Sequence, residues 1–377
     1  MVAGEASGDV LAGLLLHALK QRWSPLDAYG IGGPHMAREG FDAWWPHHKL
    51  AVHGLGWDVL MRYREITGIR SALFKRLSLE PPSIFVGVDA PDFNLALEAR
   101  LREQGVKTVQ FVCPSVWAWR AERLPRIKNS TDHVLCLFPF EPALLAKHGV
   151  HASYVGHPLA QVIPMKPDKS AARLRLGLTE DEQVLALLPG SRASEIRHLA
   201  ALFFEVAARI KRARPGVKFL VPVVPGLEHL IQAALHASGM AASIQCVVGQ
   251  SHTVLAACDA TLIASGTATL EAALFKRPMV IVYRMSALSW QWMRRKRLQA
   301  WVGLPNILCA DFVVPEFLQD QATVENLAQA SMRWLDCAQD DPQSLERLES
   351  RFADLHTTLL RDTGALAAQA IENLLHA

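Results

Sequence analysis

The chain has 377 residues, of which 50% are hydrophobic and 20% are charged, and its formal net charge is +3. Because this length exceeds the usual size of one hydrophobic core, we expect two domains, and the small net charge gives no reason to expect nucleic-acid binding. No apolar stretch approaches the roughly twenty residues that span a bilayer, and the N-terminus lacks the basic start and apolar core of a signal peptide, so neither an integral nor an exported protein is expected.

Short apolar runs alternate with helical patterns along the whole chain. In chain order, the runs are residues 84–88, 108–112, 134–138, 153–155, 184–188, 219–223, 244–248, 260–264 and 280–283. Strands this apolar are buried on both faces, which is typical of parallel sheets covered by helices. We therefore predict an α/β fold with two doubly wound, Rossmann-like domains, residues 1–160 and 161–344, which face each other across a cleft.

The connections and the cysteines complete this outline. Residues 158–168 contain three prolines and are the predicted linker between the domains. Residues 345–377 are expected to form helices that pack back on an N-terminal domain, of this chain or of a partner chain. The six cysteines are scattered without a CxxC pair, so we expect buried, reduced thiols. They are Cys113, Cys136, Cys246, Cys258, Cys309 and Cys337.

The chain opens with a glycine-containing turn, Gly4-Glu5-Ala6-Ser7-Gly8-Asp9, between the end of a strand and an apolar helix. Gly4 and Gly8 allow a ligand to approach the backbone closely. A purely structural turn explains the same residues, so the glycines alone do not decide between the two interpretations.

Two segments have the character of membrane-surface contacts. Residues 55–77 mix apolar and basic side chains as an interfacial amphipathic helix does. The apolar stripe of this segment includes Leu60, Met61, Ile66 and Ile69. Residues 290–297 combine tryptophans with four consecutive cations, which suits anionic headgroups. The alternative for each is an ordinary amphipathic helix packed on its own domain, and nucleic acid is not favoured because no base-stacking module accompanies the tryptophans.

The apolar run 84–88 is followed at once by two carboxylates, Asp89 and Asp92. A carboxylate at the end of a buried strand can accept a proton from an attacking hydroxyl, and partial burial would make it a better proton acceptor. Asp92 has no cation near it in sequence, which makes it the preferred general base, with Asp89 as its rival. The alternative is that Asp92 caps the next helix. No histidine or third carboxylate lies nearby, so no metal site is predicted.

A small-residue loop, Pro189-Gly190-Ser191-Arg192-Ala193-Ser194-Glu195, leads from the run 184–188 into a helix. The helix is indicated by apolar residues at three- and four-residue steps from Ile196 to Ile210. The unpaired N–H groups of its first turn and its dipole favour an anion, and Arg192 adds charged hydrogen bonds, which predicts phosphate binding. The alternative is that Ser191 or Ser194 caps a surface helix whose Arg192 is solvated.

A second loop of the same kind, Ser265-Gly266-Thr267, precedes a helix predicted over residues 268–275. Gly266 lets a ligand approach the backbone, and Thr267 either caps the helix or binds a phosphate oxygen. Glu271 lies one turn further along the same face, where a carboxylate suits two neighbouring sugar hydroxyls, as an acidic residue does for ribose in dinucleotide folds. The alternative is an ordinary surface ion pair of Glu271 with Lys276 or Arg277.

Eight motifs follow one another along nearly the whole chain: GEASGD at 4–9, DAPDFN at 89–94, PSVWAWR at 114–120, FPFE at 138–141, GHP at 156–158, LPGSR at 188–192, SGTATLE at 265–271 and LPN at 304–306. Together they resemble the lipid-A-disaccharide synthase family of inverting glycosyltransferases, which have the two-domain GT-B fold. The resemblance implies transfer of a diacylated glucosamine from a UDP-2,3-diacylglucosamine donor to the 6-hydroxyl of 2,3-diacylglucosamine 1-phosphate (lipid X). The products are UDP and the β-linked lipid A disaccharide 1-phosphate.

The resemblance also implies a role for each site residue. Diphosphate ligands would be Ser191, Arg192, Ser265, Gly266 and Thr267, with Glu271 on the ribose and Asn306 as a further polar contact to the donor. These fixed donors would neutralise the departing UDP without a metal or a cofactor. Asp92 would be the catalytic base. The sugar and acceptor side would contain Ser7, Gly8, Asp9, Asp89 and His157. His157 lies beside the predicted linker and is equally explained as a structural hinge residue.

The family also implies a cellular setting, because acylated substrates must be taken from a membrane surface. We expect a cytoplasmic enzyme, peripheral on the anionic inner face of the inner membrane of a Gram-negative bacterium. Family members normally carry more residues before the first strand than Met1-Val2-Ala3. We therefore expect either a shortened strand or a start further upstream.

The sequence leaves other classes of protein open. It also leaves open whether the chain forms a homodimer. Within enzymes, the alternative is another GT-B protein that uses UDP-GlcNAc, either an N-acetylglucosaminyltransferase or a sugar-nucleotide epimerase. Outside enzymes, two parallel-sheet domains with a cleft fit a solute-binding protein, although the paired phosphate loops argue against it.

Overall fold

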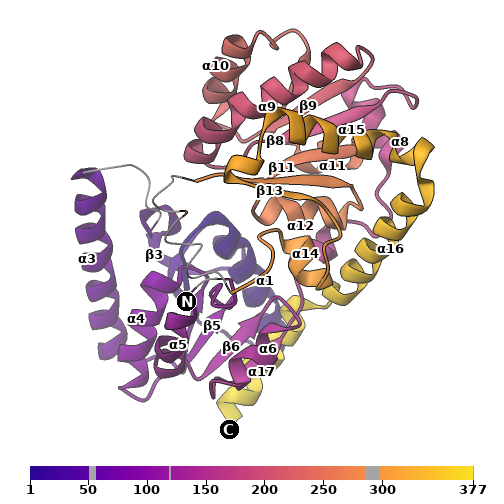
Figure 1. The fold of residues 1–377 in the computed structure, drawn as a ribbon. Coiled ribbons are helices and arrows are strands. Elements are labelled where there is room, and N and C mark those ends of the chain that lie inside the picture. Colours follow the sequence, from indigo (N-terminus) through magenta and orange to yellow (C-terminus); the bar gives the residue numbers. More distant parts are fainter. Residues whose placement is uncertain (51–56, 119, 286–289, 291–297, 377) are drawn as a thin grey trace. The chain divides into compact units, whose positions relative to one another are not determined.

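The computed structural model describes residues 1–50, 57–118, 120–285, 290 and 298–376 (Figure 1). Contacts between residues divide the chain into two compact units. Unit 1 comprises Met1–Gln161 and Thr358–Ala377, and unit 2 comprises Val162–Thr357. Each unit is a parallel sheet with helices on both faces, which confirms the predicted fold class.

Unit 1 contains a seven-stranded sheet in the order β3-β2-β1-β4-β5-β6-β7. The strands are β1 (Val2–Ala3), β2 (Tyr29–Gly32), β3 (Asp42–Pro46), β4 (Ile84–Val88), β5 (Lys107–Phe111), β6 (His133–Cys136) and β7 (Ala152–Tyr154). All neighbouring pairs are parallel. The chain therefore starts in the middle of the sheet and builds outward in both directions, which is the strand order of nucleotide-binding folds.

The described helices of unit 1 cover three separate hydrophobic clusters. They are α1 (Ala6–Arg22), α2 (Pro34–Arg38), α3 (Trp57–Leu79), α4 (Pro91–Arg102), α5 (Leu124–Ser130), α6 (Glu141–Ala146), α7 (Pro158–Val162) and α17 (Thr363–His376). Successive residues of β4 point to opposite faces: Phe85 packs in the cluster with α3 and α4, whereas Val86 and Val88 pack in the cluster with α1 and α17. This alternation explains why the strand is apolar throughout.

Helix α3 corrects one membrane prediction. Ile69 is buried in the cluster beneath α3 together with Leu73, and Ile66 packs against the same cluster. The interpretation of Ile66 and Ile69 as membrane-facing residues is therefore wrong, because both side chains fill the space against the sheet and α4. The side chains of residues 57–62, which include Leu60 and Met61, lie outside the described residues, and so do residues 291–297 of the second candidate segment.

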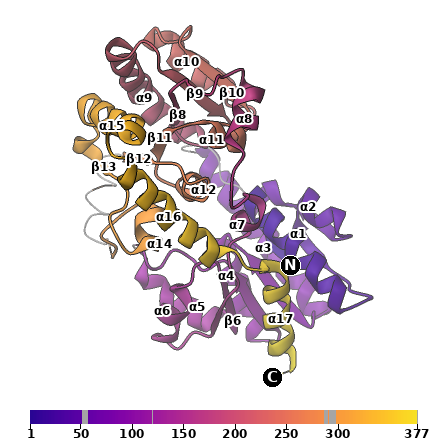
Figure 2. The same cartoon turned by 90° about the vertical axis from the view of Figure 1, so that its right-hand side faces the viewer.

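Helix α17 packs on α1 within unit 1 (Figure 2). Ala367, Ala368 and Ile371 join the cluster of α1. Arg22 strengthens the contact, because its guanidinium donates to Gln369 at 2.9 Å and pairs with Glu372 at 2.6 Å. The C-terminal helix thus covers one face of the first sheet.

Unit 2 repeats the strand order of unit 1 in a six-stranded sheet, β10-β9-β8-β11-β12-β13. The strands are β8 (Val184–Leu188), β9 (Lys218–Val223), β10 (Ile244–Val248), β11 (Ala260–Ala264), β12 (Met279–Tyr283) and β13 (Glu316–Leu318). They are all parallel. Every residue of β8 and of β11 is buried, as expected for central strands.

The helices of unit 2 follow the predicted patterns. They are α8 (Lys169–Leu176), α9 (Ala193–Ala213), α10 (Glu228–Ser238), α11 (Ser251–Ala257), α12 (Thr267–Leu274), α14 (Leu304–Cys309), α15 (Val324–Asp340) and α16 (Pro342–Leu359). Helix α9 shows the expected apolar stripe, because Ile196, Phe203 and Ile210 are all buried in one cluster with β8 and β9. None of the helices in the described part of the chain is long and apolar enough to cross a membrane.

Candidate functional site

In unit 2, the two predicted phosphate loops leave neighbouring strands at the same edge of the sheet. β8 and β11 are adjacent, with β9 and β10 on one side and β12 and β13 on the other. The strand order reverses between them, and open α/β sheets bind ligands at the carboxyl ends of strands at such a switch point. The loops after β8 and β11, residues 189–192 and 265–266, therefore lie where the fold favours a ligand.

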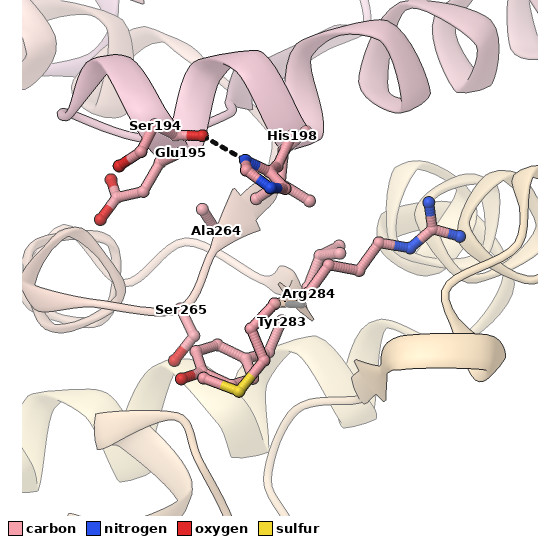
Figure 3. Close-up of a pocket in the computed structure, with 10 residues that line it drawn as sticks. Ser194, Glu195, His198, Ala264, Ser265, Tyr283 and Arg284 are labelled. Carbon is pink, nitrogen blue, oxygen red and sulfur yellow. Dashed lines mark hydrogen bonds between the residues drawn. The ribbon is translucent and has the colours of Figure 1, made fainter. Parts of the chain in front are cut away.

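A pocket at this edge brings together the predicted donor residues of unit 2, with Asn306 as the exception. Its lining includes Ser191, Arg192, Ser265, Gly266, Thr267 and Glu271. An adjoining pocket shares Glu195, Ser265 and Tyr283 with it and extends to His198 (Figure 3). Both helices that begin at the pocket, α9 and α12, contribute residues of their first turns to its lining, where a helix dipole favours an anion.

A carboxylate occupies the first turn of α9. Glu195 Oε2 accepts hydrogen bonds from the backbone N–H groups of Ser191, at 2.9 Å, and Arg192, at 3.3 Å. Neither Ser191 nor Ser194 caps the helix, so the serine-cap alternative is wrong. At Gly190, which has a φ of +134°, a Cβ atom would come within 2.3 Å of Glu195 Cβ. Only glycine fits there, and the loop presents the same N–H groups that a phosphate would use.

In the second loop, the hydroxyl groups of Thr267 and Ser265 have different environments. Gly266 is the N-cap of α12, and Thr267 is the first helical residue, with an exposed side chain at the pocket. Capping by Thr267 is therefore not observed, and its hydroxyl is available to a ligand. The Ser265 hydroxyl donates to the backbone carbonyl of Val302 at 3.1 Å.

Glu271 pairs with a residue that the sequence did not indicate. Its Oε2 lies 3.3 Å from Nε2 of His252, in the first turn of α11. The predicted alternative partners, Lys276 and Arg277, donate to backbone carbonyl groups instead, so that alternative is wrong. Glu271 remains part of the pocket lining, with His252 as a second polar group beside it.

Asn306 is fully buried and its amide is used within unit 2. Its Nδ2 donates to Glu316 Oε1 at 2.8 Å and to the carbonyl of Val314 at 2.9 Å. Glu316 in turn accepts from the N–H of Val302 at 2.9 Å, and Val302 accepts the Ser265 hydroxyl. The described contacts thus connect Asn306 to the pocket indirectly, and a direct contact with the donor stays a prediction.

In unit 1, the corresponding switch point lies between β1 and β4. The turn after β1 packs on the turn after β4, because a Cβ atom at Gly4 would come within 2.4 Å of Ala90 Cβ. Gly8 is buried against the end of β4, whereas Ser7 is exposed in the first turn of α1. The structure therefore brings Ser7, Gly8 and Asp89 to one edge of the sheet.

The carboxylate of Asp9 is engaged in hydrogen bonds within unit 1. It is almost fully buried and accepts hydrogen bonds from three backbone N–H groups, those of Gly33 and His35 at 2.8 Å and Met36 at 3.1 Å. These groups belong to the start of α2, so Asp9 joins α1 to α2. Its predicted contact with substrate stays a prediction, and the observed contacts use both carboxylate oxygens.

Two side-chain amides hold the turn at Asp89. Asp89 and Ala90 have φ angles of 54° and 41°, a left-handed conformation that is unusual outside glycine. The Asp89 carbonyl accepts from Asn94 Nδ2 at 2.8 Å and from Gln110 Nε2 at 3.0 Å. These two side-chain hydrogen bonds are not part of the regular secondary structure. Together they hold the backbone that leads into α4.

Asp92 differs from its prediction in two respects. Its side chain is 75% exposed, so it lacks the partial burial on which the prediction relied. Both of its oxygens accept from one nitrogen of Arg123, at 2.7 and 3.0 Å, although no cation is near it in sequence. It does not cap α4, whose N-cap is Ala90, so the capping alternative is also wrong.

His157 lies in an aromatic cluster at the end of β7. Its ring stacks on Phe138 at 5.8 Å between centroids, and its Nδ1 accepts from the N–H of Leu159 at 3.2 Å. Burial lowers the pKa of His157 to about 4. The backbone N–H of His157 donates to the carbonyl of Leu359 at 3.0 Å, which connects the segment after β7 to the end of α16. These contacts favour the structural interpretation of His157.

The same cluster contains a buried carboxyl group. Glu141 accepts from Trp117 Nε1 at 2.9 Å and from the N–H of Phe138 at 3.0 Å, and burial raises its pKa to about 7. Cys113 and Cys136 place their sulfur atoms within 4.8 Å of each other and of a Glu141 oxygen. All six cysteines of the chain lie in its described part and are free thiols. The sequence spacing did not indicate that two of them meet.

Two parallel sheets with the same strand order, each with a glycine-containing loop at its switch point, are typical of the GT-B class of fold. Solved structures of this class resemble the chain. One is UDP-GlcNAc 2-epimerase from Neisseria meningitidis bound to UDP-GlcNAc, with a TM-score of 0.64 at 12% identity, covering 98% of this chain and 97% of that one. Another is a putative UDP-N-acetylglucosamine 2-epimerase from Listeria monocytogenes, with a TM-score of 0.64 at 13% identity, covering 97% of this chain and 92% of that one.

Sequence comparison is more specific than fold. Residues 1–371 match the family described as lipid-A-disaccharide synthetase. The lipid-A-disaccharide synthase of Albidiferax ferrireducens is 64% identical over 375 residues, covering 100% of this chain and 96% of the relative. That of Verminephrobacter eiseniae is 60% identical, with the same coverage of both chains. The chain therefore belongs to the lipid-A-disaccharide synthase family and is a glycosyltransferase of lipid A biosynthesis, so the epimerase and solute-binding alternatives are not favoured.

Proposed function

We propose that this chain transfers 2,3-diacylglucosamine from UDP to the 6-hydroxyl of 2,3-diacylglucosamine 1-phosphate, with inversion at the anomeric carbon. The observation that carries the proposal is the pocket of unit 2, where two phosphate-type loops and a carboxylate one turn inside α12 line one cavity. Family membership supports the reaction, and a structural neighbour solved with UDP-GlcNAc supports a nucleotide-sugar donor.

On the donor side, the diphosphate binds the first turns of α9 and α12, with Arg192 and Thr267 as its side-chain ligands. Arg192 is 71% exposed and its guanidinium lies 3.8 Å from Glu195, so it can turn to an incoming anion. The diphosphate takes over the N–H groups that Glu195 holds in its absence. Glu271 binds the ribose hydroxyls. As the bond between the sugar and UDP breaks, these donors neutralise the charge that develops on the leaving phosphate.

On the acceptor side, inversion requires a base on the sugar face opposite UDP, and unit 1 supplies the carboxylates. Asp92 accepts the proton of the 6-hydroxyl as its oxygen forms the new bond to the anomeric carbon. Ser7 and Asp89 bind the sugar from the neighbouring turns. Asp9 and His157 act through the segments that they hold in place, and not by contact with the reacting atoms.

The acylated substrates are taken from an anionic membrane surface. The described outer face of α3 supports this proposal, because Tyr63 and Arg64 are exposed and Arg76 and Lys75 follow on the same helix. Purified protein is expected to co-sediment with anionic vesicles and to be released at high salt, because salt screens surface charge. Co-sedimentation that is indifferent to salt would contradict the electrostatic part of the proposal.

The test of the proposed reaction is a discontinuous assay of disaccharide formation from the acylated donor and acceptor, with UDP-GlcNAc as a water-soluble control donor. Glu271→Ala should weaken UDP binding by about 1–3 kcal/mol, the range for a lost charged hydrogen bond. Glu228→Ala, at the half-buried start of α10 and outside the pocket lining, is the matched control and should leave UDP affinity unchanged. If the Glu271 variant binds UDP normally and still forms the disaccharide, the ribose must bind elsewhere.

A further inference from the structure

Three arginines from two segments of unit 1, α3 and the region of η2, lie near the first turn of α4. Arg123, in the short helix η2 (Ala121–Arg123), holds both oxygens of Asp92. Arg70, on α3, donates to the backbone carbonyl of Asp92 at 3.3 Å. Arg120, the residue before η2, lies within electrostatic range of both Arg123 and Asp92. We call these three residues the arginine triad.

The positive charges of Arg120 and Arg123 act on each other. Burial lowers the pKa of Arg120 first, the positive charge of Arg123 lowers it further, and Asp92 and Glu122 oppose the shift. Asp92 and Glu122 are the carboxylates that act on Arg120. The N-terminal end of the twelve-residue helix α4 adds further positive potential at the same place. The site favours an anion with more charge than one carboxylate.

The exposure of the ion pair shows which partner can move. The Arg123 side chain is only 16% exposed, whereas that of Asp92 is 75% exposed. Arg123 is thus largely buried, and the more exposed carboxylate pairs with it from the solvent side. An anion that arrives from solvent meets Asp92 first and can replace it on a guanidinium that stays in place. Guanidinium groups bind phosphate oxygens as well as carboxylate oxygens.

We propose that the arginine triad is a phosphate-monoester subsite that receives the phosphate of the sugar acceptor, and that this phosphate takes Arg123 from Asp92. The proposal rests on the proposed function, which assigns a phosphorylated acceptor and an Asp92 base. In the exchange, one ion pair breaks and another forms, and no covalent bond changes. Asp92 loses its hydrogen bonds to Arg123, and its oxygens become available to the 6-hydroxyl.

One consequence concerns substrate choice. Without a phosphate, Asp92 stays paired with Arg123. It would have to give up this ion pair to accept the proton of the 6-hydroxyl. The base is uncovered only when a phosphorylated acceptor is bound. The enzyme therefore selects the phosphate twice, once by binding it and once by releasing the base, which separates acceptors with and without the 1-phosphate more sharply than binding alone.

The experiment compares two acceptors, diacylglucosamine with and without its 1-phosphate, in wild-type enzyme, Arg123→Ala and the charge-matched control Arg175→Ala, whose arginine is exposed on α8 of unit 2. Wild type and the control should prefer the phosphorylated acceptor by about 10- to 100-fold in kcat/KM, the size of a charged interaction. Arg123→Ala should lose most of this preference. With the phosphate-free acceptor it should be at least as fast as wild type, because its Asp92 is already free.

Other outcomes overturn the proposal. If Arg123→Ala slows both acceptors equally, Arg123 only supports the fold of the site. Arg123→Lys, which keeps the charge but not the planar guanidinium, should show an intermediate preference. It replaces the alanine variant if that variant binds UDP abnormally. If Arg123→Ala instead loses binding to phosphatidylglycerol vesicles and keeps its acceptor preference, the triad binds lipid headgroups. Failure of the proposed function looks different, because wild type would then form no disaccharide from either acceptor.

Discussion

Glu141→Gln should make the stability of unit 1 less dependent on pH. Glu141 is buried beneath Trp117 and Phe138, and this burial raises the pKa of its carboxyl group from 4.5 to about 7. An unfolded chain releases this proton near its ordinary pKa, whereas the folded chain keeps it to about pH 7. Folding is therefore favoured by Glu141 below pH 4.5, and that contribution is lost as the pH rises to about 7.

The size of the effect follows from the two pKa values. At 1.36 kcal/mol for each pH unit, the folded state loses about 3 kcal/mol between pH 4.5 and 7. Glutamine cannot ionise, so the variant should gain about 3 kcal/mol relative to wild type over this interval. Exchanging a carboxyl for an amide adds a fixed offset, which does not alter the slope. His157, whose pKa is lowered, contributes equally to both proteins and cancels in the difference.

The assay is urea unfolding at a series of pH values from 4.5 to 8, followed by hydrogen exchange in β4, β5 and β6, because a two-domain chain does not unfold in one step. Glu103→Gln removes the same charge from an exposed position after α4 and should run parallel to wild type. The reasoning is refuted if the Glu141→Gln curve also runs parallel to wild type at every pH, since Glu141 would then be ionised normally in the folded protein.

Four further predictions concern the site and the core. Arg192→Ala should weaken UDP binding in calorimetric titration by about 1–3 kcal/mol, and unchanged affinity would place the diphosphate elsewhere. Glu195→Gln should strengthen UDP binding, because it removes a negative charge from the N–H groups of α9; weaker binding would show that the carboxylate shapes the loop. Asp92→Asn should keep its fold and UDP affinity but lose about two to four orders of magnitude of turnover, and turnover within about tenfold of wild type would transfer the role to Asp89. Ile69→Ser should destabilise unit 1 by about 2–5 kcal/mol in urea; an unchanged unfolding midpoint with lost vesicle binding would restore the membrane interpretation.

Strands that are buried on both faces could be predicted from the sequence. The bounds of β4, β8 and β11 agree with the apolar runs 84–88, 184–188 and 260–264. The prediction did not name β2, whose sequence YGIG is half glycine, or β3, whose residues are not buried. It also lacked β13, a three-residue strand at the edge of its sheet. The edge strands β3 and β13 lack the continuous apolar pattern because neighbouring elements cover them only in part. Strand β2 is largely buried, but its two glycines contribute no apolar side chains to the pattern.

The loops after β8 and β11 could be predicted for a related reason, whereas ligand binding by them stays a prediction. Each consists of consecutive residues, and a small-residue turn between an apolar strand and a helix is a local signal. The contact partners of the site residues could not be predicted in this way. Arg123 reaches Asp92 from another helix, and His252 reaches Glu271 from the helix before. Glu195 was within the predicted motif, but its occupation of the first turn of α9 depends on side-chain direction, which the sequence pattern does not carry.

The sequence by itself determined the two parallel-sheet domains, the switch-point loops and the family resemblance, because these depend on local patterns and on motifs in order along the chain. Only the tertiary structure decided which charges meet. It showed that Ile69 belongs to the core, that Asp92 is exposed and paired with Arg123, and that Asp9 joins two helices. The physical reason is that hydrophobic periodicity selects the face of an element that is buried, whereas ion pairs and hydrogen bonds depend on which elements the fold places next to that face.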